Sequence, residues 1–382
     1  MHQYDNQKNI FVSWGYHGHN HAKANIHPSL SPKLAKSVGG GGYFIDMPRI
    51  QFKHSYDHII SLENLLGAWK EFSCGKRSRK DIQEFERDLM GNIISLHRDL
   101  VAKNYRHSAY EAFKVYDPKP RDIHKAIVRD RLLHHALHRM LYPFFDRTFI
   151  SDSLSSRLEK GTHRAVNRFC KFAYKVSQNH TKTAWVLKCD IRKFFASIDQ
   201  ATLISILTRY IHDRDIIGLI SEIIGSFHST GKGVGLPLGN LTSQLLVNVY
   251  MNEFDQFVKH KLKAKCYIRY ADDFVILSSD RSWIQSIIPR INDFLRHKLN
   301  LEIHPNKMSI RTVSSGVDYL GWVNFTDYRA LRTGTKKRMF RRIRGKQGKI
   351  ETVQSYLGML GHGNTKLLRD RVIDIANEYE NK

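Results

Sequence analysis

The sequence predicts an α+β fold, with helices and antiparallel strands in separate parts of the chain. Three observations support this prediction. Apolar residues recur at helical spacing between Tyr56 and Leu100, two β-branched and aromatic runs at 185–190 and 266–277 carry aspartates, and a basic helical segment follows residue 329. The two aspartate-bearing runs are expected to be strands of one sheet that brings the acids together.

Composition and charge indicate a globular protein with a polyanionic partner. The 382 residues are 41% hydrophobic and 25% charged, enough for two or three subdomains around a sizeable core. Lys and Arg outnumber Asp and Glu by 61 to 36, which gives a formal net charge of +25. Nucleic acid is the commonest polyanion that relieves such self-repulsion, so binding should weaken steeply with salt. The basic residues are spread along the chain, which argues against a membrane-surface helix.

The sequence has no signature of export or membrane insertion. No uninterrupted apolar run approaches about 18 residues, and the N-terminus lacks a charged region followed by an apolar one. The four cysteines are scattered without Cys-x-x-Cys spacing, which is typical of free thiols in a reducing compartment. We therefore expect a cytoplasmic protein without a membrane partner.

Residues 1–50 differ from the remainder of the chain. They contain His17, His19, His21 and the glycines at 39–42, with few periodic apolar positions. Histidines at this spacing are compatible with a transition metal, but the glycine-rich context favours a flexible extension.

The following segment begins with a predicted helical hairpin between Tyr56 and Leu100. Its connection at 75–80 is basic and is interpreted either as a solvated turn or as a phosphate contact. A polar, glycine-containing loop at 151–162 would line a nucleic-acid channel.

A short alternating strand beginning at Phe113 runs into prolines and predicts a β-hairpin tip with Lys119 and Arg121. Arginine offers a bidentate fork to phosphate oxygens. The tip is therefore interpreted either as a triphosphate clamp or only as a basic turn.

The tetrapeptide Tyr270-Ala271-Asp272-Asp273 lies between two apolar runs and predicts a hairpin with the acids at its tip. Side chains alternate along a strand, so both acids reach one place only if the backbone turns between them. Two carboxylates held together repel each other unless a divalent cation neutralises them. The tetrapeptide alone leaves a magnesium site and an ordinary turn equally open. Asp190, at the end of an apolar strand, supplies a third carboxylate in a matching setting.

Five stretches between residues 55 and 382 resemble, in order and spacing, the motifs of the reverse transcriptase family. They are the first palm motif at Asp190, the template and nucleotide motif at 235–244, the Tyr-x-Asp-Asp box at 270–273, a later palm motif at 297–307 and the primer-gripping hairpin at 317–322. One such motif would be weak, whereas five in this order make the resemblance specific.

The resemblance implies a bacterial or phage-encoded RNA-directed DNA polymerase with a right-hand plan: helical and β fingers, a ferredoxin-like antiparallel palm sheet that carries the aspartates, and a small helical thumb. The expected divisions are an N-terminal extension at 1–50, an N-terminal helical region with fingers at 51–184, a palm at 185–330 with a fingers insertion near 201–236, and a basic thumb at 331–382. The run from 329 to 349 has ten Lys or Arg and no acid, so it is either a solvated face or a surface that tracks the template-primer backbone.

The resemblance also implies the site residues. The catalytic residues would be Asp190, Asp272 and Asp273, and these together with Ile191 would hold two Mg²⁺ ions, for which Mn²⁺ would substitute. Nucleotide binding is expected at Lys119, Arg121, Phe195, Leu238, Gly239, Gln244 and Lys307. Nucleic-acid binding is expected at Tyr270, Leu320, Gly321, Lys336, Lys337, Arg338, Arg341 and Arg342.

Four residues in or near these motifs carry more specific expectations. Phe195 lies where the family places a bulky side chain under the incoming sugar, and an aromatic ring there excludes a 2′-hydroxyl. Phe194 is expected in the core, and Asp199 as the cap of the following helix. Lys307 is interpreted either as a donor to the triphosphate or pyrophosphate, or as a solvated lysine.

Leu238 and Gln244 resemble one subgroup of the family. Many reverse transcriptases have Gln before Gly239 and Pro after Ser243, where this chain has Leu and Gln. Diversity-generating retroelement enzymes are similar to this chain here, which implies error-prone copying at template adenines, because Leu cannot donate the hydrogen bonds that Gln would make. Ala271 departs from that subgroup, which commonly has Met there.

Two alternatives stay open. Antiphage-defence reverse transcriptases, which use an associated noncoding RNA, share much of this layout, and a non-catalytic RNA-binding scaffold would keep the same fold. Retron enzymes usually keep the Gln and Pro that are replaced here, and no appended zinc-binding or endonuclease segment of a group II intron maturase is expected. The expected partners are a structured RNA template, a DNA or RNA primer, dNTPs, and a small basic accessory protein or a second copy of the chain.

Overall fold

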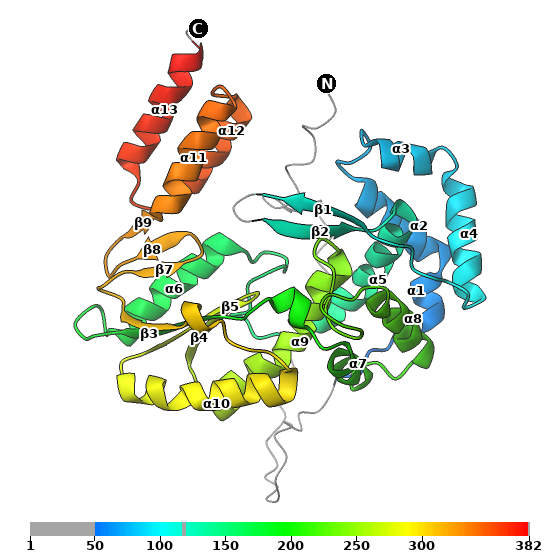
Figure 1. Ribbon diagram of the computed structural model, residues 1–382, viewed down its shortest axis with the longest axis horizontal. Coiled ribbons are helices and arrows are strands. Elements are labelled where there is room, and N and C mark those ends of the chain that lie inside the picture. The colour runs from blue at the N-terminus through cyan, green and yellow to red at the C-terminus, as the bar shows by residue number, and fades with distance from the viewer. Residues whose placement is uncertain (1–49, 117–119, 381–382) are drawn as a thin grey trace, which may run out of the picture.

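The structure, a computed structural model, describes residues 50–116 and 120–380. Within these residues the strands form three antiparallel sheets, of two, four and three strands. Figure 1 shows the N-terminal helices on one side, the four-stranded sheet on the other, and the C-terminal helices standing above the three-stranded sheet. The mixed helical and antiparallel composition predicted from the sequence is therefore confirmed. The predicted N-terminal extension with its histidines, and Lys119, lie outside the described residues.

The N-terminal part is a group of four helices, where the sequence predicted one helical hairpin. They are α1 (Tyr56–Ile60), α2 (Leu62–Ser73), α3 (Lys80–Glu86) and α4 (Leu89–Val101). The extra breaks have local causes: the Ser61 side chain accepts a hydrogen bond from Asn64 N and begins α2, and Asp88 does the same for Gly91 N and α4. The basic connection predicted at 75–80 is a turn as far as Arg79, and Lys80 begins α3.

A two-stranded hairpin and two long helices follow. They are β1 (Glu111–Val115), β2 (Arg121–Lys125), α5 (Val128–Asp146) and α6 (Thr162–Val176). The prediction that Arg121 lies in the hairpin tip is wrong, because Arg121 is the first residue of β2 and pairs with Val115. The chain re-enters the strand directly after Pro120, which has no N–H to donate to the ladder.

The four-stranded sheet consists of β3 (Trp185–Asp190), β4 (Cys266–Tyr270), β5 (Asp273–Ser278) and β6 (Ser309–Thr312) in the order β4-β5-β3-β6. Between β3 and β4 the chain forms η1 (Phe194–Ser197), α7 (Gln200–Thr208), α8 (Arg214–Gly225), α9 (Leu241–Gln256) and η2 (Phe257–Lys261). Between β5 and β6 it forms α10 (Arg281–Leu299) and η3 (Pro305–Lys307). With α9 and α10 as the two crossovers, this is the split βαβ order of a ferredoxin-like sheet.

Both faces of this sheet are covered, which explains why its strands are nearly continuous apolar runs. Leu187 of β3 and Phe274 of β5 belong to the core formed with α9 and α10, whereas Val186 and Val275, their neighbours in the chain, pack with α6. Figure 1 shows α6 and α10 on opposite sides of the sheet. The sheet is thereby held rigidly between helices at the end where β3 stops and β5 begins.

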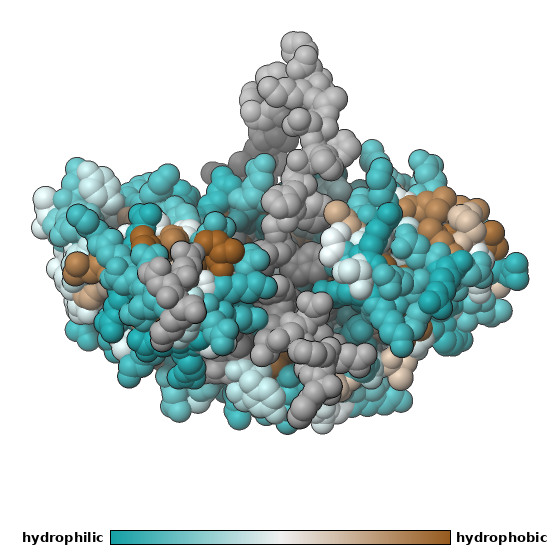
Figure 2. All heavy atoms as spheres, turned by 90° about the horizontal axis from the view of Figure 1, so that it is seen from above, coloured by the Kyte–Doolittle hydropathy of each residue, from teal (hydrophilic) through white to brown (hydrophobic). Residues whose placement is uncertain are grey.

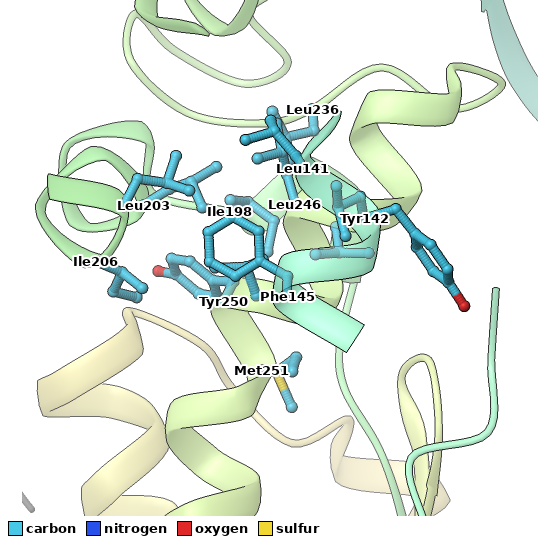
Figure 3. Close-up of a cluster of buried hydrophobic side chains, with 14 of the residues drawn as sticks. Leu141, Tyr142, Phe145, Ile198, Leu203, Ile206, Leu236, Leu246, Tyr250 and Met251 are labelled. Carbon is cyan, nitrogen blue, oxygen red and sulfur yellow. The ribbon is translucent and has the colours of Figure 1, made fainter. Parts of the chain in front are cut away.

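The core extends from the sheet into the N-terminal helices. Figure 3 shows side chains of α5, α7 and α9 in one cluster, including Phe145, Leu203, Leu246 and Tyr250. Burial of four such side chains contributes roughly 1.5–3 kcal/mol each before the entropy of ordering is subtracted. Helix α9, which leads into β4, is therefore anchored along most of its length.

The C-terminal part has its own small core. Its elements are β7 (Val317–Tyr319), β8 (Trp322–Asn324), β9 (Arg329–Leu331), α11 (Thr333–Gly345), α12 (Ile350–Leu360) and α13 (Lys366–Glu380). Met339, Ile343 and Leu360 pack around Trp322. The chain breaks between α12, which ends at Leu360, and α13, which begins at Lys366. Gly363 lies in the break, and a Cβ there would overlap the Trp322 ring.

The exposed surface is mostly hydrophilic. Figure 2 shows scattered hydrophobic side chains and a larger hydrophobic patch at the end of the molecule that holds the N-terminal helices. The exposed apolar side chains of the N-terminal helices include Leu62 and Leu66 of α2 and Met90 and Ile94 of α4. Among the described residues, no helix combines the length and apolar character needed to cross a membrane. The four cysteines are free thiols.

Candidate active site

The tetrapeptide at 270–273 forms the connection between β4 and β5. Tyr270 pairs with Asp273, which leaves Ala271 and Asp272 as a two-residue hairpin loop. Ala271 has a φ of 55°, as the first loop position of such tight hairpins requires. The predicted hairpin with acids at its tip is confirmed, with Asp272 in the loop and Asp273 as the first residue of β5.

The sheet brings the third carboxylate to the same place. Asp190, the last residue of β3, pairs directly with Asp273, and opposed residues on antiparallel strands have neighbouring side chains. The backbone continues this contact, because Ile191 N donates to Asp272 O at 3.1 Å. The backbone of Asp190 is also fixed, since its carbonyl accepts from His304 N at 2.7 Å.

Two of the three acids, Asp272 and Asp273, have raised pKa values. Burial and the nearby carboxylates of Asp273 and Asp190 raise the pKa of Asp272 to about 6. Burial also raises the pKa of Asp273, and the cations Lys188, Lys307 and Arg332 act in the opposite direction. The three aspartates thus form a site that holds negative charge at a cost and would gain from a cation.

Lys307 forms an ion pair with one of these acids. Its Nζ lies 2.6 Å from Asp190 Oδ1, and its side chain is about 41% exposed. The residue ends η3, which directly precedes β6, the strand next to β3 in the sheet. Neither sequence interpretation named this ion pair, since residues 117 positions apart in the chain meet only through the sheet order.

The donor set of the three aspartates fits a hard divalent cation. Carboxylate oxygens are the ligands that Mg²⁺ prefers. The pKa of Asp272 is raised by burial and then by its acidic neighbours, whose charge a divalent ion would neutralise. The aliphatic side chain of Ile191 has no ligand atom, so only its backbone carbonyl oxygen would serve as a ligand. Within 50–116 and 120–380, no three His, Cys, Asp or Glu side chains already stand as a metal-binding group.

The raised pKa of Asp272 predicts a stability difference that depends on pH. Above pH 6 the ionised carboxyl lowers the unfolding free energy of the metal-free protein by up to about 3 kcal/mol, since a pKa unit is about 1.4 kcal/mol. Below the unfolded-state pKa of 3.8 the carboxyl is protonated in both states and this loss disappears. Asp272→Asn, which cannot ionise, should therefore be more stable than the parent at about pH 8, by a margin that shrinks towards about pH 4. Urea unfolding in EDTA measures this margin, and one that stays constant with pH would contradict the assignment.

The residues expected at the nucleotide lie around the start of α9. Leu238 and Gly239 precede this helix, and Gln244 lies in its first turns. Leu238 O accepts from His124 N at 3.1 Å, so strand β2 of the first hairpin lies against this segment. Gly239 has a φ of 112°, and a Cβ there would lie 3.1 Å from Ile123 Cγ2. Glycine is therefore required both by backbone conformation and by the approach of β2.

The two phenylalanines of η1 differ in how deeply they are buried. Phe194 is buried in the core, as predicted, whereas Phe195 is only partly buried. Phe195 O accepts from Leu236 N at 2.8 Å, which ties η1 to the segment before α9. Asp199 caps α7 by accepting from Thr202 N at 2.7 Å, which confirms the capping prediction.

Two groups of expected nucleic-acid contacts lie outside the aspartate cluster. Tyr270 and Leu320 pack against the same core cluster, and the Tyr270 hydroxyl accepts from Thr162 Oγ1 at 3.2 Å. Leu320 and Gly321 form the tight turn between β7 and β8, both at positive φ. The basic residues of the second group lie on α11, in the C-terminal part that stands apart from the four-stranded sheet in Figure 1: Lys336, Lys337, Arg338, Arg341 and Arg342.

The sequence interpretation missed Arg269, the residue immediately before the tetrapeptide. It is completely buried and pairs with Asp255 of α9, with Nη2 to Oδ2 at 2.7 Å. One signal was present: an arginine inside an apolar strand that is buried on both faces requires a buried acid as partner.

Three carboxylates gathered at one end of an antiparallel sheet are typical of enzymes that transfer phosphoryl groups with divalent ions. Residues 117–323 match the family model described as reverse transcriptase (RNA-dependent DNA polymerase). This match covers more than half of the 382 residues, and the chain belongs to the reverse transcriptase family. The predicted enzyme class, an RNA-directed DNA polymerase, is confirmed at the level of the family.

Several curated sequences are similar to this chain. Protein YkfC of Escherichia coli strain K12 is 25% identical over 59% of this chain and 69% of that protein. The group II intron-encoded protein LtrA of Lactococcus lactis subsp. cremoris is 24% identical over 55% of this chain and 44% of LtrA. The retron Ec73 reverse transcriptase of Escherichia coli is 31% identical over 25% of this chain and 33% of that enzyme. The match thus spans less than half of LtrA, and the subgroup within the family stays a prediction.

Proposed function

We propose that this chain copies an RNA template into DNA by two-metal phosphoryl transfer at Asp190, Asp272 and Asp273. The observation that carries the proposal is the strand register, which pairs Asp190 with Asp273 and leaves Asp272 in the adjoining loop. When bound, two Mg²⁺ ions would activate the primer 3′-hydroxyl and neutralise charge on the leaving pyrophosphate. The aspartates would hold these ions, with the Ile191 carbonyl as a further ligand.

The cation Lys307 would change partners during this reaction. Without nucleotide it neutralises Asp190 across 2.6 Å. With Asp190 engaged by a metal ion, its ammonium group would be free to donate to the triphosphate or the departing pyrophosphate. The same side chain would then stabilise the site both before and after nucleotide binding.

The remaining assignments follow the polymerase plan. We assign the four-stranded sheet to the palm at 185–330, the helices and first hairpin at 51–184 with the insertion near 201–236 to the fingers, and 331–382 to the thumb. The basic side chains of α11 support a thumb that tracks the template-primer backbone, because α11 contains no acid. Arg121, on the hairpin that contacts Leu238, would approach the triphosphate together with Lys119.

The direct test is primer extension on RNA. With a labelled primer annealed to an RNA template, dNTPs and Mg²⁺ or Mn²⁺, we expect cDNA that EDTA abolishes, because the clustered carboxylates would need a divalent ion. The matched control replaces dNTPs with rNTPs. Tight RNA binding without synthesis in either metal would refute the proposal and support a non-catalytic scaffold.

We further propose that Leu238 makes copying error-prone at template adenines, as in a diversity-generating retroelement. Leu238 directly precedes the glycine that faces the β2 strand, and its aliphatic side chain has no hydrogen bond to offer a nascent base pair. Leu238→Gln should lower misincorporation opposite adenine by about 10-fold, the effect of about 1.4 kcal/mol. Sequencing of cDNA from both proteins measures this. Faithful copying across adenines by the parent enzyme would contradict it.

The template is proposed to be a dedicated structured RNA. Sequencing RNA that copurifies with the protein from its native host would identify it. Adenine-specific mutation of the corresponding DNA indicates diversification, whereas a single noncoding RNA that is copied faithfully favours antiphage defence. A small basic protein or a second copy of the chain is the partner expected from the resemblance to retroelement enzymes.

A further inference from the structure

A completely buried cation lies directly behind the aspartate loop. The Arg269 side chain is 0% exposed, and its position on β4 directs it towards α9. Nε and Nη2 donate to the two Asp255 oxygens at 2.8 and 2.7 Å, and Nη2 also donates to Ser153 Oγ at 3.0 Å. A guanidinium group in this environment is held in one orientation, because moving it would leave a buried charge without partners.

The remaining donors of Arg269 connect α9 with the aspartate loop. Nη1 donates to Asn248 Oδ1 at 3.3 Å and to Ala271 O at 3.2 Å. A guanidinium has five N–H donors, and these five hydrogen bonds use all of them. Asp255 and Asn248 are two turns apart on α9, so the guanidinium bridges this helix and the backbone of Ala271.

The backbone of Arg269 is fixed as well. Its N–H donates to Asp152 O at 3.0 Å, and its carbonyl accepts from Leu154 N at 2.9 Å. Asn248 Nδ2 donates to Ser155 O at 2.9 Å, which closes the connection between this segment and α9. Strand β4, helix α9 and the segment 152–155 therefore meet at one side chain.

The loop that receives this hydrogen bond is strained. Ala271 has a φ of 55°, a conformation that costs a residue with a Cβ roughly 1–2 kcal/mol. Such strain persists only where the surrounding structure holds it. The hydrogen bond that Arg269 donates to Ala271 O can hold the loop in this strained conformation.

We propose that Arg269 is a positioning residue for the metal-binding aspartates, whose guanidinium fixes the Ala271–Asp272 loop relative to helix α9. This inference rests on the proposed function of the aspartates. Because its side chain is completely buried, Arg269 would touch neither substrate nor metal. It determines where Asp272 and Asp273 stand, and a displacement of about 1 Å at reacting groups can lower a rate about 100-fold.

The test separates positioning from stability with two variants. In the triple variant Arg269→Met, Asp255→Leu, Tyr267→Phe, the buried ion pair and the Tyr267 hydroxyl that donates to Asp255 are replaced by apolar groups, which leaves no charge unpaired. Arg269→Lys keeps the charge beside Asp255 but lacks the planar fork that reaches Ala271. The control Arg209→Met, Glu253→Leu removes another ion pair, 2.7 Å long, which joins the end of α7 to α9.

Three quantities are measured for each protein: the urea midpoint, amide hydrogen exchange of the peptide 266–278 without metal, and single-nucleotide addition over a Mg²⁺ titration. We expect both Arg269 variants to fold, with at least about 10-fold faster exchange in the loop, a kcat lowered about 10- to 100-fold, a raised Mg²⁺ requirement and an unchanged KM for dNTP. The control should match the parent in exchange and kcat.

Exchange and kcat equal to the parent in a folded Arg269 variant would overturn the inference and leave Arg269 a purely structural residue. A parent protein that makes no DNA would refute the proposed function instead. In that case the exchange measurement still decides whether Arg269 holds the loop.

Discussion

Asp273→Asn is expected to lower the rate of nucleotide addition by at least about 10³-fold, equivalent to about 4 kcal/mol of transition-state stabilisation. Asp273 pairs with Asp190 across the sheet and is the first residue of β5, so both acids would bind the same ions. Asparagine keeps the shape of the side chain and removes its charge. The effect should therefore appear in kcat, with affinity for the template-primer unchanged.

The matched control for this variant is Asp280→Asn. Asp280 follows the same strand and caps α10 by accepting from Trp283 N at 3.0 Å, a role that asparagine also fills. Pre-steady-state addition of one nucleotide, with RNA affinity measured separately, provides the comparison. A rate for Asp273→Asn within tenfold of the parent would remove the aspartates from the chemistry.

Phe195→Ala is expected to raise the use of rNTPs relative to dNTPs about 100-fold. Phe195 is only partly buried in η1, so its ring can face the incoming sugar, and its removal would leave room for a 2′-hydroxyl. Rejection of one added hydroxyl by an apolar wall is worth about 10²-fold, which sets the size of the change. The ratio of kcat/KM for matched rNTP and dNTP measures it.

Phe194→Ala is the control for the neighbouring ring. Phe194 is 4% exposed and lies in the main core, so its loss should cost roughly 3–5 kcal/mol of stability without changing sugar selectivity. If both variants shift the rNTP preference equally, the effect comes from loosening η1, and the specific role of Phe195 is wrong.

The clustering of the three acids, which the proposed chemistry requires, also lowers the stability of the fold. Burial and the neighbouring carboxylates raise the pKa of Asp272, and we expect the neutral variant Asp272→Asn to be more stable and inactive. Opposite changes of stability and activity are typical of groups placed for chemistry.

The sequence by itself determined the local features of this protein. The alternating and apolar patterns of β3, β4 and β5 predicted the strands, and the tetrapeptide predicted the hairpin, because a two-residue loop is set by its own residues. The cap at Asp199 was equally predictable, since a cap is formed by groups within one turn of a helix. The net charge of the chain predicted a nucleic-acid partner without any knowledge of the fold.

Only the tertiary structure decided which distant groups meet. The order β4-β5-β3-β6 placed Lys307 against Asp190, and the packing of α9 under β4 placed Asp255 against Arg269. Sequence periodicity shows which face of a strand or helix is buried, but it does not show which partner covers that face. The aspartates could therefore be found from the sequence, whereas the side chains that hold and neutralise them could not.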